Sequence, residues 1–328
     1  MPKVSVIIPV YGVEKFIARC ARSLFEQTLD DIEYIFVDDC TPDNSIKILR
    51  KILTDYPHRG KQTRIVKMPT NSGLPAVRRH GIQLATGDYI IHCDSDDWVD
   101  VHAYEMMYNK AVEGNYDIVF CDFYITNGNK HKLVNRKINN STLNNLTLKI
   151  VQKVYWQLWS VMTKKSVISE NKINYPTANN GEDFALMVQL LYYSNKFTHI
   201  DRPLYYYFLN ENSITKAKDY DSYIKRTNDA KTNTELVINF YKNKNEEYVY
   251  NDIIFLLKLY SRRPLSNITH IEKYRKIWYS IFPEIEQEPI LFKRNIPMNL
   301  KVNYYSIRTN TYTLLKKIQH ILKMEKYI

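Results

Sequence analysis

Residues 89–97 read YIIHCDSDD, a short apolar run followed at once by three carboxylates within four positions. The apolar run is typical of a buried strand, and carboxylates at its end repel one another unless water or a cation neutralises them. Hard oxygen ligands of this kind suit Mg²⁺ or Mn²⁺, and Mg²⁺ takes its remaining ligands from water and substrate phosphates. The alternative is an acidic turn that caps the next helix. Neighbouring segments therefore have to decide between a metal site and a cap.

Apolar runs alternate with amphipathic segments on both sides of this stretch, which predicts a doubly wound, mostly parallel α/β sheet flanked by helices. We expect strands at residues 4–10, 34–37, 64–68, 88–93 and 117–123, separated by helices at residues 14–27, 46–53, 76–85 and 103–112. Farther along, we expect a helix at residues 184–193 and a strand pair at residues 197–200 and 204–208. Ligands of such sheets bind at the carboxyl ends of the strands, where residues 38–39 and 94–97 both gather carboxylates.

The charge pattern divides the 328 residues into two parts. The net charge is +11, and residues 216–328 hold 21 Lys and Arg against 12 Asp and Glu. We therefore expect an α/β domain over residues 1–215 and a basic, Tyr-rich, mainly helical region over residues 216–328. The four cysteines have no ligand-like spacing, and no apolar run reaches about 18 residues, so we expect a cytoplasmic protein without a membrane span.

Six segments occur in an order and spacing that are typical of one enzyme family. They are residues 4–12 (VSVIIPVYG), 27–39, 71–81, 86–97, 181–183 and 203–215. With these segments the chain resembles the family 2 glycosyltransferases over roughly residues 3–215. The resemblance implies a GT-A fold with a mixed sheet, a nucleoside-diphosphate sugar as donor, a divalent metal (Mn²⁺ or Mg²⁺) and inversion at the anomeric carbon.

The resemblance also assigns the donor site. The residues that it places at the nucleotide sugar are Pro9, Val10, Tyr11, Glu14, Asp39, Arg78, Asp94 and Asp96. Tyr11 would lie against the nucleotide base. A carboxylate such as Asp39 can accept a hydrogen bond from uracil N3–H or a ribose hydroxyl. The donors of Arg78 can fork across a diphosphate. For several of these residues a purely structural alternative stays open. Residues 9–11 could serve strand-to-helix packing, and Arg78 could be a solvated helix residue.

The metal ligands are expected within the acidic run. Asp96 is the first candidate and Asp97 the second, whereas Asp94 would orient the ribose or support the site. A metal there would offset the charge that builds on the leaving nucleoside diphosphate.

Asp183 is the candidate general base, with Glu182 as its substitute. Inverting transfer is one in-line displacement that needs a carboxylate to take the proton of the acceptor hydroxyl. The alternative is a capping role, because both residues open a helix whose first amides favour negative charge.

Three positions depart from the family pattern. Trp159 is a candidate acceptor contact or a core residue, but relatives often carry Trp-x-Lys there and this chain has Val161. Phe208 stands where relatives often have Arg after the tyrosines, which puts a phosphate contact there in doubt. Cys40 follows Asp39 where the family often has Gly, so we expect a backbone conformation open to L-residues.

The tail suggests a surface for a partner. Residues 289–328 hold eight Lys and Arg and one acidic residue, and residues 314–326 place apolar side chains at helical spacing. A basic amphipathic helix can lie in an anionic membrane interface, or it can pack on its own domain. Because enzymes that the chain resembles often elongate lipid-linked glycans, we expect peripheral contact with the inner face of the cytoplasmic membrane.

The sequence thus predicts an inverting hexosyl- or hexosaminyltransferase of bacterial surface-polysaccharide assembly. It would move a sugar, from UDP in the first instance, to a glycan or lipid-linked glycan. Alternatives are a catalytically inactive nucleotide-sugar binder and a sugar nucleotidyltransferase, which would favour a Gly-rich loop after the first strand. Nucleic acid is not expected as a partner, because the acidic sheet edge repels phosphate without metal.

Overall fold

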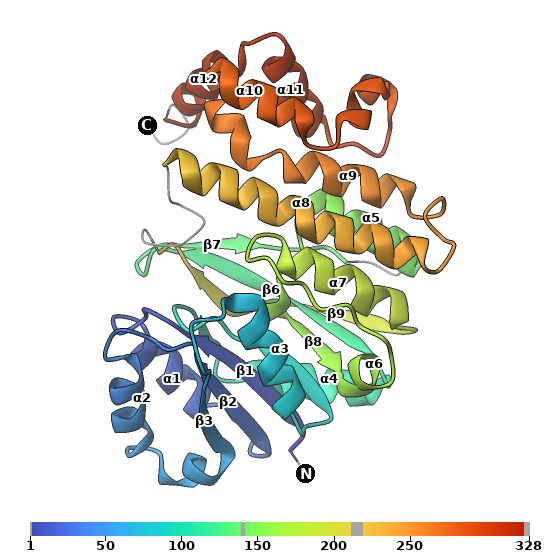
Figure 1. Ribbon diagram of the computed structural model, residues 1–328. Coiled ribbons are helices and arrows are strands. Elements are labelled where there is room, and N and C mark those ends of the chain that lie inside the picture. The colour runs from blue at the N-terminus through green and yellow to red at the C-terminus, as the bar shows by residue number, and fades with distance from the viewer. Residues whose placement is uncertain (1, 139–141, 211–218, 325–328) are drawn as a thin grey trace. The chain divides into compact units, whose positions relative to one another are not determined.

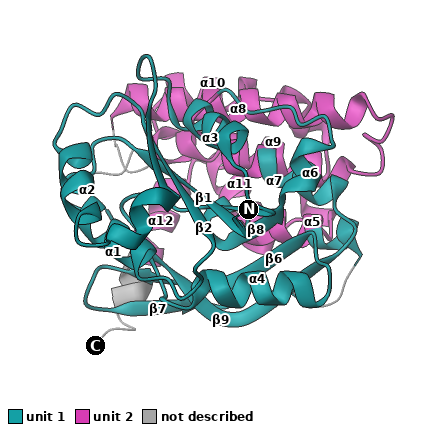
Figure 2. Cartoon of the chain, turned by 90° about the horizontal axis from the view of Figure 1, so that it is seen from below, with its two compact units in different colours: residues 1–146, 155–177, 186–211 teal, residues 147–154, 178–185, 212–328 magenta. Residues whose placement is uncertain are grey.

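The computed structural model describes residues 2–138, 142–210 and 219–324, with the backbone alone at residues 320–324. The chain forms two compact units (Figure 2). Unit 1 comprises residues 1–146, 155–177 and 186–211, and unit 2 comprises residues 147–154, 178–185 and 212–328.

Unit 1 is built on a mixed sheet with the strand order β3-β2-β1-β4-β8-β6-β9-β5, with β7 paired to β6 (Figure 1). The strands are β1 (Val4–Val10), β2 (Ile32–Asp38), β3 (Thr63–Lys67), β4 (Tyr89–His92), β5 (Trp98–Val99), β6 (Ile118–Thr126), β7 (His131–Val134), β8 (Val161–Lys164) and β9 (Phe197–Phe208). Strands β1 to β4 pair in parallel, as do β6 and β9. The pairs β4–β8, β5–β9, β6–β7 and β6–β8 are antiparallel. The sheet is therefore mixed, with more antiparallel pairing than the sequence predicts.

Helices connect and cover these strands. They are α1 (Ile17–Phe25), α2 (Ser45–Leu53), α3 (Leu74–Leu84), α4 (Ala103–Glu113), α6 (Lys165–Ser169) and α7 (Glu182–Tyr193), with the 3₁₀ turns η1 (Pro57–Gln62) and η2 (Leu158–Ser160). Most of α5 (Leu143–Lys153) belongs to unit 2. The expected strands and helices of residues 4–123 are thereby confirmed to within a few residues. The expected strand pair near residue 200 is instead one strand, β9, which keeps its pairing with β6 through a register shift at Asp122.

Strand β1 shows how the sequence creates two covered faces. Side chains of a strand alternate between faces, so the residues at positions 4, 6, 8 and 10 join one hydrophobic cluster with those of α1. Ile7 faces the other way, toward α3, where a Cβ on Gly81 would come within 2.4 Å of the Ile7 side chain. Because both faces are covered, β1 has to be apolar almost throughout.

A buried carboxylate ties the amino ends of the strands together. Glu33 of β2 accepts hydrogen bonds from Ser5 Oγ at 2.7 Å and from the Thr86 amide at 2.9 Å, and it pairs with Arg64 at 3.3 Å. Burial alone would raise the pKa of Glu33, but these hydrogen bonds hold the pKa below its usual value.

Unit 2 is helical. It contains α8 (Tyr220–Lys242), α9 (Asn251–Ser261), α10 (Glu272–Ser280), α11 (Met298–Arg308) and α12 (Tyr312–Met324), with the 3₁₀ turns η4 (Pro264–Ile268), η5 (Pro283–Gln287) and η6 (Ile290–Phe292). Residues 178–185 belong to it because Asn233 of α8 donates to the carbonyls of Ala178 and Asn180 at 2.8 and 2.9 Å. Among the described residues, no helix is both long and apolar enough to cross a membrane.

Candidate active site

The acidic run forms a tight turn at the carboxyl ends of β4 and β1. The Asp97 amide donates to the Asp94 carbonyl at 3.0 Å and closes the turn. Ser95 Oγ donates to the Pro9 carbonyl at 2.6 Å, which fixes the turn to the last residues of β1. The sequence reasoning placed this run at a strand end, and the hydrogen bonds show what holds it there.

Asp97 points into the protein. Its side chain is 0% exposed, one carboxylate oxygen accepts from Tyr205 Oη at 2.7 Å, and the other accepts from the Phe208 amide at 2.6 Å. Tyr205 Oη also accepts from the Asp94 amide at 3.1 Å, so one phenol joins both ends of the turn. Burial, and then the negative charges of the neighbouring carboxylates, raise the pKa of Asp97, although these hydrogen bonds oppose the shift. This geometry favours a structural role for Asp97 over the expected one as metal ligand.

Asp96 is less deeply buried than Asp97 and keeps part of its surface exposed. Its Oδ2 accepts from Asn210 Nδ2 at 3.1 Å, and burial together with the charge of Asp94 raises its pKa. The Asp96 carbonyl accepts from Arg19 Nη2 at 2.8 Å. The Arg19 guanidinium lies 3.8 Å from the centre of the Trp98 ring, so cation–π contact fixes it in place.

Asp94 is paired with Arg78. The Arg78 Nη2 lies 3.0 Å from Asp94 Oδ1, and the arginine side chain is buried while Asp94 is partly exposed. The next residue, Arg79, lies over the Tyr175 ring at 5.2 Å, since adjacent side chains of a helix point about 100° apart. The structure therefore places Arg78 against Asp94.

The turn offers two carboxylates to a divalent cation, and a bound diphosphate would supply further ligands. Within residues 2–138, 142–210 and 219–324, no cluster of three or more His, Cys, Asp or Glu side chains could hold a metal alone. Two partly exposed carboxylates, Asp94 and Asp96, remain at the turn, and burial, followed by the charge of Asp94, raises the pKa of Asp96. Mg²⁺ and Mn²⁺ suit such a sparse oxygen set, since substrate phosphates complete it.

Asp39 holds the loop before α3. Its two oxygens accept from the amides of Ser72 at 2.7 Å and Gly73 at 2.9 Å, and its own amide donates to the Val10 carbonyl at 3.1 Å. The carboxylate keeps further lone pairs, which a base or ribose donor could use.

Cys40 corrects an expectation. Its φ is +56°, in the left-handed region that favours glycine, and not in a conformation open to any L-residue. The Sγ atom lies 3.1 Å from the Met68 carbonyl, which secures the loop after β2. The family's usual glycine at this position was the signal that the sequence reasoning set aside.

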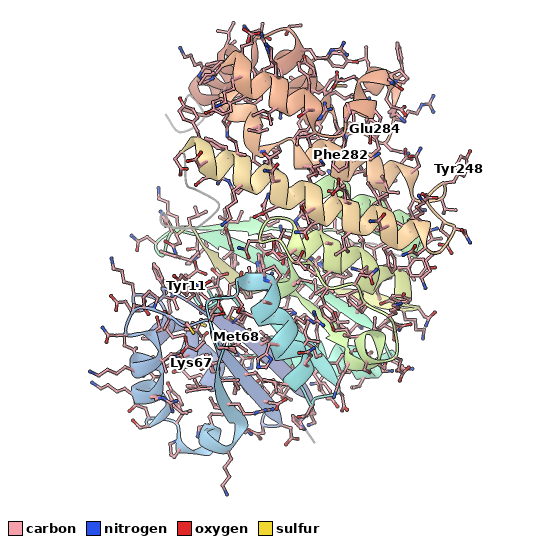
Figure 3. All side chains as sticks on the ribbon, viewed as in Figure 1. Tyr11, Lys67, Met68, Tyr248, Phe282 and Glu284 are labelled. Atoms are coloured by element: carbon pink, nitrogen blue, oxygen red, sulfur yellow. The ribbon has the colours of Figure 1, made fainter. Side chains whose placement is uncertain are left out.

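The other residues expected at the nucleotide base differ in exposure. Val10 is buried and Pro9 is half-buried, whereas Tyr11, labelled in Figure 3, is 48% exposed. Glu14 is exposed, and its carboxylate accepts from the Asn44 amide at 3.1 Å, at the start of α2. Glu14 therefore has a local role at the start of α2 that does not depend on a bound nucleotide sugar.

Trp159 belongs to the core. It is 4% exposed, and its ring stacks on Tyr205 at 4.2 Å and meets the edge of Phe123 at 4.8 Å. With no exposed ring face to offer a sugar, Trp159 is assigned to the core alternative and not to the acceptor site.

Glu182 and Asp183 form the first turn of α7, directly after Gly181, whose φ is +88°. Glu182 is buried and Asp183 is half-buried. The first amides of a helix favour carboxylates there. Their assignment as base and substitute stays a prediction.

Sequence reasoning missed Tyr205, Arg19 and Asn210, which hold the acidic turn in place. Strand alternation carried no signal for Tyr205, because the adjacent residues Leu204 and Tyr205 are both buried. Arg19 lies on α1 far from any motif, and nothing in its local sequence indicates its target.

Comparison with known proteins gives a consistent family. The model of the family described as "Glycosyl transferase family 2" matches residues 5–169. "Uncharacterized glycosyltransferase EpsJ" of Bacillus subtilis is 30% identical over 224 residues, which are 66% of this chain and 64% of that protein. "Poly(ribitol-phosphate) beta-glucosyltransferase" of Bacillus spizizenii is 31% identical over 63% of this chain and 32% of that protein. The chain thus spans less than two thirds of these relatives' length.

Solved structures share the fold. S. aureus TarS 1-349 in complex with UDP-GlcNAc has a TM-score of 0.58 at 18% identity, covering 87% of this chain and 90% of that one. Mannosyltransferase PcManGT from Pyrobaculum calidifontis in complex with GDP-Man and Mn²⁺ has a TM-score of 0.55 at 11% identity, covering 94% and 87%. These likenesses confirm the expected GT-A fold.

Proposed function

The chain belongs to family 2 of the glycosyltransferases, and from that premise we propose that it transfers a sugar from a UDP-sugar to a hydroxyl of a glycan. The acidic turn carries the proposal. Asp97 is fully buried and bonded to Tyr205 and Phe208, while Asp94 and Asp96 keep exposed surface at the carboxyl edge of the sheet. An edge of that kind is where α/β sheets bind ligands.

The donor would lie along the ends of β1, β2 and β4. Tyr11 offers an exposed ring to the base, and Asp39 offers carboxylate lone pairs while it holds the loop before α3. Asp94, kept in place by Arg78, would accept from the ribose. Support for UDP comes from TarS, whose structure is known in complexes with UDP-GlcNAc and with UDP.

Asp96, with help from Asp94, would hold a divalent cation against the diphosphate. Support comes from the Mn²⁺ in the PcManGT complex. The cation would supply charge stabilisation for the leaving diphosphate. Asp97 serves instead to set the direction of Asp96, because its own oxygens are bonded to Tyr205 and Phe208.

Transfer would be one in-line displacement. The acceptor oxygen forms a bond to the anomeric carbon as the bond to the diphosphate oxygen breaks, and Asp183 takes the hydroxyl proton. The displaced UDP carries away the electron pair, and the configuration at the anomeric carbon inverts. Glu182 is the substitute base if Asp183 only caps α7.

A polymer rich in hydroxyl groups is the acceptor class that we propose. The support is the relative named poly(ribitol-phosphate) beta-glucosyltransferase, at 31% identity. A glycan on a lipid carrier belongs to the same class, since the reacting group is again a sugar or polyol hydroxyl.

Calorimetry with UDP, GDP and dTDP, with and without Mn²⁺, tests the donor site. For the wild type we expect Mn²⁺-dependent binding of one nucleotide, and for Asp96→Asn a loss of about tenfold or more, since a metal ligand is removed. Asp88→Asn is the matched control, because Asp88 is exposed at the opposite end of β4. Equal binding by both variants would reject Asp96 as the ligand.

Asp183→Asn separates catalysis from binding. We expect nucleotide binding to be kept and sugar transfer, or slow donor hydrolysis, to fall by about 10²-fold or more. If the wild type binds UDP but neither transfers nor hydrolyses any UDP-sugar offered, the inactive binder becomes the better assignment. If the protein instead converts UDP-sugar and pyrophosphate to UTP and a sugar phosphate, it is a nucleotidyltransferase.

A further inference from the structure

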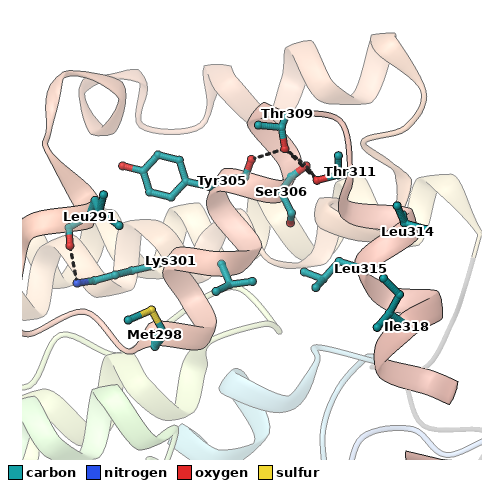
Figure 4. A pocket seen from close by; sticks show the side chains of 11 residues that line it. Leu291, Met298, Lys301, Tyr305, Ser306, Thr309, Thr311, Leu314, Leu315 and Ile318 are labelled. Carbon is teal, nitrogen blue, oxygen red and sulfur yellow. Dashed lines mark hydrogen bonds between the residues drawn. The ribbon is translucent and has the colours of Figure 1, made fainter. Parts of the chain in front are cut away.

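Unit 2 carries an apolar groove between α11 and α12 that the proposed reaction does not use (Figure 4). The groove has a volume of about 530 Å³, and its walls are mainly the aliphatic side chains of Leu291, Met298, Val302, Leu315 and Ile318. Figure 4 shows Leu315 and Ile318 on α12 with Met298 on the opposing helix. Such an apolar surface on the outside of a unit indicates a binding site for an apolar partner.

Exposed apolar side chains continue beyond the groove. Phe292 of η6 is 79% exposed, Met298 68%, Leu314 59% and Leu291 53%. Single exposed apolar residues need no explanation, but this set lies within 28 consecutive residues around one groove. We call this set, with Val302 and Ile318, the apolar face of α11 and α12.

The same segment is strongly basic. Residues 289–324 contain no Asp or Glu. The exposed cations Arg294, Lys316 and Lys317 lie on it, and Arg308 is exposed with its nearest acidic group, Glu286, at 4.0 Å. An apolar face rimmed by cations complements a surface that has an apolar interior and an anionic boundary.

We propose that the apolar face of α11 and α12 docks on an anionic lipid bilayer. An amphipathic helix with cations on its polar side lies in the plane of the interface, its apolar side chains at the acyl boundary and its lysines at lipid phosphates. α12, from Tyr312 to Met324, is too short to span a bilayer, so it lies on the surface. A second copy of this chain fits less well, because pairing the faces would bring two basic surfaces together.

This docking needs no catalytic residue and goes beyond the proposed transfer. It would hold the enzyme at a surface where acceptors on lipid carriers gather. Its failure is also separable from a failure of the proposed function, because nucleotide binding can be measured on the same variants.

The test is co-sedimentation of the full chain with phosphatidylcholine vesicles, with or without phosphatidylglycerol, at low and high salt. We expect binding to the anionic vesicles only, with salt weakening it. The double variant Leu314→Ser/Ile318→Ser should bind about tenfold more weakly, since it removes apolar area from the face. Lys316→Gln/Lys317→Gln should also bind about tenfold more weakly and lose part of the salt dependence.

The matched control is Tyr248→Ser/Val249→Ser, which removes two exposed apolar side chains elsewhere in unit 2 (93% and 61% exposed). It should bind vesicles like the wild type. Circular dichroism and Mn²⁺–UDP calorimetry should be unchanged in all variants, which shows that they are folded. The proposal would be overturned by equal binding to neutral and anionic vesicles or by no binding to either kind. It would also be overturned if Leu314→Ser/Ile318→Ser and Lys316→Gln/Lys317→Gln both bound like the wild type. A shift from dimer to monomer in the groove variants would assign the face to a second copy instead.

Discussion

Tyr205→Phe is the most direct test of how the acidic turn is built. The change removes one buried hydroxyl that donates to Asp97 at 2.7 Å and accepts from the Asp94 amide at 3.1 Å. A hydrogen bond to a charged group contributes about 1.5–3 kcal/mol, and a buried amide that loses its partner costs about 1 kcal/mol or more. With Asp97 ionised, above its raised folded-state pKa, we therefore expect a loss of about 3 kcal/mol in the free energy of unfolding.

The loss should depend on pH with a defined sign. The folded-state pKa of Asp97 is raised, mainly by burial and then by its acidic neighbours, and the Tyr205 bond lowers it. A group with a raised folded pKa contributes stability that is present below its unfolded pKa and is lost as the pH rises through the folded pKa. At acidic pH Asp97 is protonated, so the variant forfeits only neutral hydrogen bonds and should lose about 1–2 kcal/mol.

Urea unfolding of the full chain, followed by circular dichroism and by tryptophan fluorescence, measures both values. Tyr206→Phe is the control. The Tyr206 ring stacks on Trp98 at 5.2 Å, and we expect a change within about 0.5 kcal/mol. A loss for Tyr205→Phe that is no larger than that of the control, or equal losses below and above the pH at which Asp97 ionises, would refute the reasoning.

Three further changes probe the same unit. Glu33→Gln should cost about 2 kcal/mol at neutral pH; because the folded pKa of Glu33 is lowered, this cost should vanish as the pH falls through it, which unfolding at several pH values would show. Cys40→Gly should raise the free energy of unfolding by about 1 kcal/mol by relieving a positive φ, whereas Cys40→Ala, which keeps that φ, should not. Arg19→Met keeps the packing volume but loses the hydrogen bond to the Asp96 carbonyl. We expect the affinity for Mn²⁺–UDP, measured by calorimetry, to fall about five- to tenfold. Unchanged affinity would show that Arg19 does not position the turn for binding.

The alternation of elements was predictable because each buried strand of unit 1 is a short apolar run. β4 is the clearest case, since Tyr89–His92 is covered on both faces and is followed at once by charge. β5 and β8 were missed for a physical reason. β5 has only two residues and exists because it pairs with Tyr205 and Tyr206 of β9, a partner about a hundred positions away. Short strands of this kind are set by their partners rather than by their own propensity.

The site was predictable as a place but not as a set of roles. Residues 94–97 could be located from sequence, because the order and spacing of the neighbouring family segments favoured a ligand site over a helix cap. Their division of labour could not, since it depends on which side chain turns toward β9. Only the structure shows that Asp97 is fully buried and Asp96 partly exposed, and only the structure shows that Cys40 has a positive φ.

The charge balance of the turn explains why three carboxylates can stand within four residues. Arg78 lies 3.0 Å from Asp94, and Arg19 is bonded at 2.8 Å to the backbone of Asp96, so two positive charges face three negative ones. With all three carboxylates ionised, the turn has an excess of one negative charge, which by itself would repel a diphosphate. In the proposed function, a divalent cation would reverse that sign and make the same turn attractive to the donor. Binding of nucleotide should therefore depend on the metal more steeply than loss of a single ligand bond would predict, because the metal changes the sign of the field that the diphosphate meets.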